Sequence, residues 1–186
     1  RAFVFFAYPG AISGNRVWTV DATSQATPLL QASSEQGKEA LELLGNDFTW
    51  IDMFYGFVPG SIGETSVLAI LLGALFLLLT GIGNWKIMFS TFIGMVSTAY
   101  LTNYFGVAIN SDNPMLFLPP HYHFVMGGFA FGLVFMATEP VTAAHTDKGR
   151  WIYGFLIGFM CVIIRAINPA YPEGMMLAIL FANAFA

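Results

Sequence analysis

The sequence predicts an all-α membrane protein, a polytopic helix bundle, from its composition, its long apolar runs and the positions of its charges. The chain has 186 residues, of which 56% are hydrophobic and 10% are charged. An ordinary soluble domain has about 25% charged residues, so this composition indicates a lipid environment. A membrane helix needs about 20 mostly apolar residues. Since lipid offers no hydrogen-bond partners, apolar runs of this length are predicted to be helical.

Four complete membrane spans are predicted, with a partial span at each end of the chain. The complete spans are residues 66–83, 87–109, 121–138 and 151–167. Residues 2–12 are typical of the end of an earlier span, and residues 173–186 of a span that has only begun. The chain starts with Arg1, and no signal peptide is expected. We therefore expect a single membrane domain, residues 1–186, that is the C-terminal part of a longer subunit.

One long polar segment, residues 15–59, separates the first partial span from the others, and most of its charges are acidic. The short loops between later spans carry Lys86, Lys148 and Arg150. Cytoplasmic loops are enriched in Lys and Arg, so the short loops are predicted to face inward and the long segment outward. Arg165 fits this distribution less well. The chain has no basic patch, and no nucleic-acid partner is expected.

Cysteine and histidine give little sign of metal chemistry. The single cysteine, Cys161, excludes a disulfide within the chain and any multi-cysteine iron–sulfur or zinc site. His121 and His123 form a His-x-His pair, but on a helix their rings would diverge by about 200°. They are expected in an interfacial belt. His145 is expected in a solvated loop, with contact to a partner or a bound cofactor as the alternative.

Small residues predict close helix contacts. Gly154 and Gly158 are separated by one helical turn, and Gly127 is followed directly by Gly128. Glycine at such positions permits two helices to approach closely. The spans are therefore expected to pack as a bundle.

Two of the predicted spans begin alike, which indicates an internal repeat. The stretches PGSIGETSVLAIL, from Pro59, and NPAYPEGMMLAIL, from Asn168, align when Glu64 is matched with Glu173. Broken or re-entrant helices in corresponding positions are typical of transporter repeats and mark a site near the membrane midplane. The copies would be parallel. Chance similarity is the alternative, since Leu-Ala-Ile-Leu is common in apolar sequences.

Three carboxylates are candidates for an ion pathway. Glu64 and Glu173 lie at helix starts broken by Gly or Pro, and Glu139 directly precedes Pro140 at the cytoplasmic end of a span. Carboxylates suit a hard cation such as sodium, and ionisable groups at membrane depth are usually functional. The alternative is that they face water and stabilise the first turn of a helix through its dipole.

The polar stretch DATSQATPLL begins at Asp21 and contains a good helix start. The Thr27 hydroxyl can cap a helix that has Pro28 at its first position. A plain cap is one interpretation. The same arrangement gathers unpaired backbone N–H groups, which also stabilise a phosphate, so an ester of phosphate with the Thr27 hydroxyl is the other interpretation.

The residues from Asp21 to Thr27 resemble the flavinylation motif D-x-x-[S/T]-G-A-T, with Gln25 in place of glycine. Four further stretches, GSIGETSVLAIL from Gly60, GGFAFGLVFMATEPVTAAHT from Gly127, GRWIYG from Gly149 and NPAYPEGMMLAILFAN from Asn168, resemble the B subunit of the sodium-translocating NADH:quinone oxidoreductase. The resemblance covers essentially the whole chain. The D subunit of the Rnf complexes is homologous and shares the flavin motif, but the long matched stretches favour the sodium-translocating oxidoreductase.

The resemblance implies specific roles for the motif residues. Thr27 would carry FMN through a phosphoester bond, and Asp21 and Ser24 would be recognised by a flavin transferase on the outer side of the bacterial inner membrane. Gln25 and Ala26 complete the motif. The resemblance also implies a fold like that of urea transporters, further subunits, a riboflavin nearby, ubiquinone as electron acceptor and Na⁺ as the transported ion. Electrons would pass from NADH-derived flavins toward ubiquinone and drive sodium outward.

Two alternatives remain at this point. A membrane subunit of an Rnf-type ferredoxin:NAD oxidoreductase would share the motif and differ in its electron donor. A non-redox channel or solute transporter would explain the broken helices and the carboxylates without a flavin. Covalently bound flavin distinguishes the last alternative from the other two.

Overall fold

The computed structural model describes residues 7, 27–29, 32, 48–61, 63–109, 111, 113–167 and 173–186. Within these ranges the elements are helical and there is no strand, which confirms the predicted all-α class. Most of the partial span at 2–12 lies outside the described residues. So do the motif residues Asp21, Ser24, Gln25 and Ala26.

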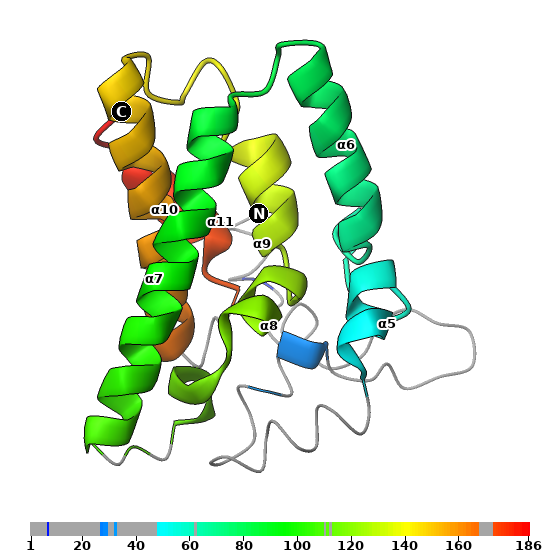
Figure 1. Ribbon diagram of the computed structural model, residues 1–186, viewed down its shortest axis with the longest axis vertical. Helices are drawn as coiled ribbons and strands as arrows, with labels where there is room; N and C mark the ends of the chain where they lie inside the picture. Colours follow the sequence, from blue (N-terminus) through cyan, green and yellow to red (C-terminus); the bar gives the residue numbers. More distant parts are fainter. Residues whose placement is uncertain are drawn as a thin grey trace.

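Helices α7 (Trp85–Ile109) and α10 (Asp147–Ile167) lie side by side along one side of the fold (Figure 1). Both are long and apolar enough to cross a membrane. Where they touch, a Cβ on Gly158 would lie 2.6 Å from the backbone N of Met95, and a Cβ on Gly154 would meet Ser90 Oγ. The predicted close approach at these two glycines is therefore confirmed.

Helix α6 (Val67–Leu79) is shorter than the run expected at 66–83. Its 13 residues extend about 20 Å, less than the hydrocarbon thickness of a membrane. Helix α5 (Trp50–Tyr55) lies below its N-terminal end in Figure 1, and Gly56 closes α5 in the left-handed conformation, with φ 92°. Helices α5 and α6 are thus joined by the segment that contains Glu64.

The run expected as one span at 121–138 is interrupted. Helix α8 (Pro120–Val125) ends at Met126, and a short helix α9 (Phe129–Phe131) continues directly into the π-helical η2 (Gly132–Met136). The 3₁₀-helix η1 (Pro114–Phe117) precedes α8. Gly127 has φ 62°, which residues other than glycine rarely adopt, so the helical path is broken there.

Helix α11 (Met175–Asn183) follows Gly174, which also has a positive φ, of 64°. It packs against α10 and η2, and the Tyr153 hydroxyl donates a 2.6 Å hydrogen bond to Asn183 Oδ1. The helical segments α9 and α11 are therefore each preceded by a glycine turn. These two turns lie close together and build the site.

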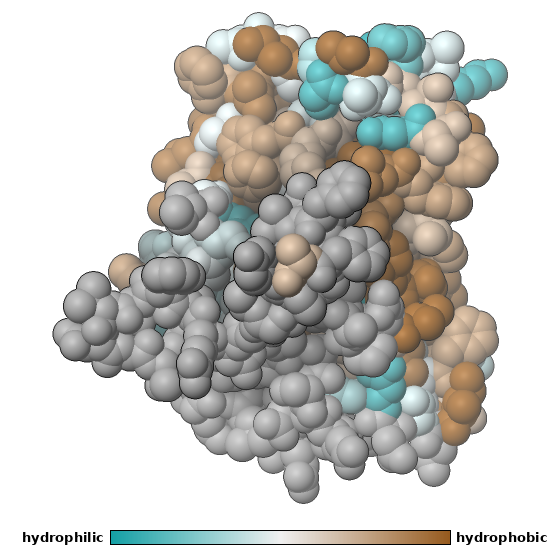
Figure 2. Space-filling model, turned by 180° about the vertical axis from the view of Figure 1, so that it is seen from behind, coloured by the Kyte–Doolittle hydropathy of each residue, from teal (hydrophilic) through white to brown (hydrophobic). Residues whose placement is uncertain are grey.

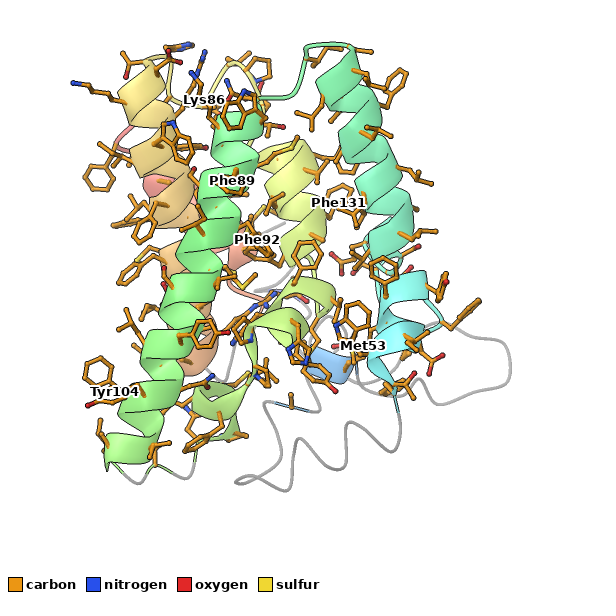
Figure 3. The ribbon with its side chains drawn as sticks, viewed as in Figure 1. Met53, Lys86, Phe89, Phe92, Tyr104 and Phe131 are labelled. Carbon is orange, nitrogen blue, oxygen red and sulfur yellow. The ribbon has the colours of Figure 1, made fainter. Side chains whose placement is uncertain are left out.

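Apolar side chains cover much of the outer surface. In Figure 2, brown and tan residues occupy most of the coloured part of the face, and hydrophilic residues gather toward the top. On α6, Leu72, Phe76 and Leu79 are 62%, 64% and 79% exposed. At the end of α7 marked by Lys86 in Figure 3, the Lys86 ammonium pairs with Asp147 at 2.7 Å. An apolar belt and a charged end are the pattern of a membrane-embedded surface.

Candidate functional site

A small cavity brings together three of the residues selected from the sequence. Thr27, Glu64 and Glu173 line it, together with Gly127 and several apolar side chains. Its volume is about 30 Å³, enough for a water molecule or a bare cation. The site therefore joins the predicted flavin-bearing threonine to two of the predicted ion-pathway carboxylates.

The two carboxylates meet at the glycine break between α8 and α9. The backbone N–H of Gly128 donates a 3.0 Å hydrogen bond to Glu173 Oε2. A Cβ on Gly128 would lie 2.7 Å from Glu64 Oε2 and 3.5 Å from Glu173 Oε2. A Cβ on Gly127 would lie 3.0 Å from both carboxylate oxygens of Glu173. The absence of side chains at the two glycines makes room for the carboxylates.

A second cavity lies on the other side of the carboxylate pair. Its volume is about 120 Å³, and Glu64, Gly128 and Glu173 line it as well, although only the two glutamates also line the first cavity. Its remaining wall includes Ser61, Phe131 and methionines of η2 and α11. Phe131 projects from α9 toward α6 in Figure 3. The carboxylates thus separate the cavity that contains Thr27 from a larger one bounded by the helices.

The pair of carboxylates has no third acidic, histidine or cysteine neighbour suited to metal binding in the ranges that the structure describes. Two carboxylates give a weaker site than the six to eight oxygen ligands that hold a structural Ca²⁺. A site on an ion path must release its ion as readily as it binds it. A cation held by these two carboxylates alone would therefore be bound weakly.

Arg165 is buried directly beside this site, with 1% of its surface exposed. Its Nη1 donates to the His123 carbonyl at 2.7 Å, and its Nη2 donates to the Met126 carbonyl at 2.9 Å. Its Nε donates to the Glu173 carbonyl at 3.3 Å, and the guanidinium lies 5.8 Å from the centre of the Phe129 ring. One side chain of α10 therefore connects the ends of both glycine turns.

The two histidines of the His-x-His pair occupy different environments. His121 is exposed, and its carbonyl accepts a hydrogen bond from Trp50 Nε1 at 3.3 Å. His123 is fully buried, and neither of its ring nitrogens has a hydrogen-bond partner among the described residues. The expectation of an interfacial belt is wrong for His123, because α8 turns its ring into the interior. His145 is exposed, as expected for a loop.

Glu139 lies apart from the other two candidate carboxylates, in the turn that follows η2. Its carboxylate accepts hydrogen bonds from Thr142 Oγ1 at 2.7 Å and from the backbone N–H groups of Thr142 and Val141. The hydrogen bond from the Thr142 hydroxyl is the largest cause that lowers the pKa of Glu139, and the two backbone hydrogen bonds lower it further. The structure therefore brings Glu64 and Glu173 together and gives Glu139 a turn-stabilising role.

Thr27 directly precedes the helical residues Pro28 and Leu29, the position that the sequence predicts for a helix start. Its side chain is partly exposed at the cavity wall. A partly exposed threonine is compatible with attachment to a phosphate. The cavity itself is far too small for a flavin ring, so the ring would have to lie outside it.

Sequence reasoning missed the residues that assemble the site. Gly127 and Gly128 were expected to serve helix contacts, whereas they form the turn against which the carboxylates lie. The sequence analysis noted Arg165 only because it does not fit the predicted placement of Lys and Arg in the cytoplasmic loops. Its signal was an arginine within an otherwise apolar helix, because such residues are rare and usually functional.

Comparison with known proteins agrees with the resemblance seen in the sequence. The chain matches the model of the NQR2, RnfD, RnfE family over residues 1–186. It is 53% identical over 188 residues to the Na(+)-translocating NADH-quinone reductase B subunit of Yersinia pestis, and 54% identical over 189 residues to that of Haemophilus influenzae (strain PittEE). Each comparison covers 100% of this chain and 45% of the relative, so the chain spans a little under half of their length. The chain belongs to the NQR2, RnfD, RnfE family.

Proposed function

We propose that this chain is part of the membrane subunit of a redox-driven sodium pump. The subunit carries covalent FMN on Thr27, passes electrons from NADH-derived flavins toward ubiquinone and couples this transfer to movement of Na⁺. The observation that carries the proposal is the shared cavity of Thr27, Glu64 and Glu173. The similarity to proteins named as B subunits of the Na(+)-translocating NADH-quinone reductase favours this pump over an Rnf-type complex.

The proposed setting is the bacterial inner membrane, with a polytopic bundle and the flavin-bearing segment 15–59 on the periplasmic face. Two helices of membrane-spanning length and the exposed apolar side chains of α6 support it. A urea-transporter-like internal repeat is part of the proposal. It is supported by α6 and α11, because each follows a glutamate and the two carboxylates meet at the same glycine.

Thr27 is the proposed attachment point, with its Oγ esterified to the phosphate. When bound there, FMN supplies one-electron redox chemistry. The protein contributes the position of the hydroxyl, just before a helix whose N–H groups favour an anion. Asp21, Ser24, Gln25 and Ala26 would identify the site to a flavin transferase during maturation.

Glu64 and Glu173 are the proposed sodium ligands. Two carboxylates so close together repel each other, and a cation between them relieves this repulsion. A phosphodiester at Thr27 would add a further negative charge at the wall of the same cavity. The Gly128 N–H holds one oxygen of Glu173 and leaves its other oxygen available to a cation. Glu139 remains a candidate for a separate position at the cytoplasmic end.

Further parts of the pump lie outside this chain or have no assigned residues here. Other subunits would deliver electrons, and a riboflavin and a quinone site would lie nearby. The exposed apolar surfaces of α6 and α7 are suited to lipid or to neighbouring membrane helices.

In-gel flavin fluorescence of the denatured full-length protein tests the attachment, with Thr27→Val compared with wild type in cells that contain the transferase. Fluorescence is expected to survive denaturation in wild type and to vanish in the variant. Thr23→Val is the matched control, since it removes a hydroxyl from the same motif and should keep the fluorescence. Fluorescence that persists in Thr27→Val would place the flavin elsewhere and remove the basis of the proposal.

A further inference from the structure

We infer that Arg165 is a positioning residue for the sodium site: it holds the two glycine turns together and thereby fixes the Glu173 carboxylate against Gly128. This inference rests on the proposed function of Glu173. It concerns a residue of α10 that lines neither cavity and acts through backbone atoms.

The first step is the placement of the guanidinium. Arg165 is 1% exposed and has no carboxylate within ion-pair distance among the described residues. A buried unpaired charge is costly unless hydrogen bonds compensate it. Three backbone carbonyls provide this compensation, at 2.7, 2.9 and 3.3 Å. A charge kept in the interior with this set of partners indicates a role beyond filling space.

The second step is the identity of those carbonyls. Two belong to His123 and Met126 at the C-terminal end of α8, and the third belongs to Glu173, just before the turn at Gly174. The chain on both sides of the site is therefore fixed by a single group. Carbonyls freed by a helix break are also ligands that sodium uses in transporters. Arg165 occupies them here and leaves the cation to the carboxylates.

The third step links the guanidinium to the carboxylate. Glu173 is held at two points, its carbonyl by Arg165 and its Oε2 by the Gly128 N–H. Gly128 lies two residues after Met126, which Arg165 also binds. Loss of the guanidinium would free both ends of this arrangement and let the two carboxylates separate.

The geometry requires arginine and not only a positive charge. The three N–H directions of the planar guanidinium reach three carbonyls on two segments, whereas a lysine ammonium is a single point on a flexible chain. Arg165→Lys therefore keeps the positive charge and removes most of the hydrogen bonds that join the two segments. This variant separates positioning from electrostatics.

The test uses the assembled complex with Arg165→Lys in the full-length protein. Hydrogen–deuterium exchange of the peptide that contains Gly128 is expected to be about tenfold faster, as for loss of one net hydrogen bond. The KM for sodium in NADH-driven quinone reduction is expected to rise about tenfold. The kcat at saturating sodium should change less than about twofold, because the redox groups are not altered. A general structural role would lower kcat and complex yield and leave KM unchanged.

Cys161→Ala is the matched control. Cys161 lies one turn before Arg165 on α10, is fully buried and touches the same carbonyl of Glu173 only weakly, at 3.9 Å. Its loss should leave exchange at Gly128 and the KM for sodium unchanged. If Arg165→Lys does not accumulate, Phe129→Leu, which removes the ring beside the guanidinium, tests the same inference with an expected rise in KM of about threefold.

Glu173→Gln separates the inference from the proposed function. A raised KM in Glu173→Gln with normal exchange and normal KM in Arg165→Lys would overturn the inference and leave the function in place. An unchanged KM in Glu173→Gln would overturn the proposed sodium site. Exchange at Gly128 in Arg165→Lys would then decide alone whether Arg165 positions Glu173: faster exchange supports this role and unchanged exchange contradicts it.

Discussion

Gly128→Ala adds one methyl group at the point where the two carboxylates meet. Gly128 has φ −79° and ψ 15°, which alanine adopts readily, so the backbone is not strained. The new Cβ would lie 2.7 Å from Glu64 Oε2, whereas ordinary contacts begin near 3.4 Å. The nearest atom ends a flexible side chain. We therefore expect the carboxylate to move by about 0.7 Å while the fold is kept.

The expected effect on sodium binding follows from this displacement. At an effective dielectric constant of 20, the attraction between two unit charges falls from about 6.6 kcal/mol at about 2.5 Å to about 5.2 kcal/mol at about 3.2 Å. The difference of about 1.4 kcal/mol corresponds to a tenfold loss of affinity. The KM for sodium should therefore rise about tenfold.

Sodium titration of NADH-driven quinone reduction by the assembled complex measures this KM. Gly81→Ala is the control, because Gly81 has φ 73° and no atom lies within 4 Å of a Cβ there. The control carries a backbone penalty and does not touch the carboxylates, so its KM should equal that of wild type. An unchanged KM in Gly128→Ala, in a complex of normal yield, would refute the reasoning that these carboxylates bind sodium at this glycine.

Three further predictions concern the rest of the fold. Because Glu139 has a lowered pKa when folded, its contribution to stability is present above the usual glutamate pKa and is lost as the pH falls through the lowered value. Thr142→Val removes the hydrogen bond that contributes most to the lowered pKa of Glu139. When the melting temperature is measured against pH, it should therefore fall less on acidification in this variant than in wild type. Gly158→Leu should destabilise the protein by about 3 kcal/mol or more by forcing α7 and α10 apart, which thermal melting in detergent would show. Tyr153→Phe removes the 2.6 Å bond to Asn183 and should cost about 1 kcal/mol in the same assay, and an unchanged melting temperature in either variant would contradict that contact.

The helical class was predictable because hydropathy depends on composition along the chain, not on distant contacts. The apolar runs expected at 87–109 and 151–167 coincide with α7 and α10. The interruption between α8 and α9 was not predictable, since Gly127 and Gly128 are equally compatible with a continuous helix that packs closely. The contact of Gly127 with the Glu173 carboxylate joins segments far apart in the sequence.

The candidate site was predictable in its parts and not in its assembly. Thr27 stood out by its motif, and Glu64 and Glu173 by the breaks in their helices. Their meeting at one glycine depends on contacts between segments far apart in sequence, which no local pattern encodes. The role of Arg165 was hidden for the same reason, because its partners are backbone carbonyls and carry no sequence signal.

The most direct test of the central claim is sodium uptake by inverted membrane vesicles, expressed per NADH oxidised. The variant carries Glu64→Gln together with Glu173→Gln, and Asp52→Asn, which alters a carboxylate that caps α5, is the control. The account predicts that uptake per NADH falls at least about tenfold in the double variant and stays at the wild-type value in the control. Wild-type uptake per NADH in the double variant would show that sodium crosses by a route without these carboxylates.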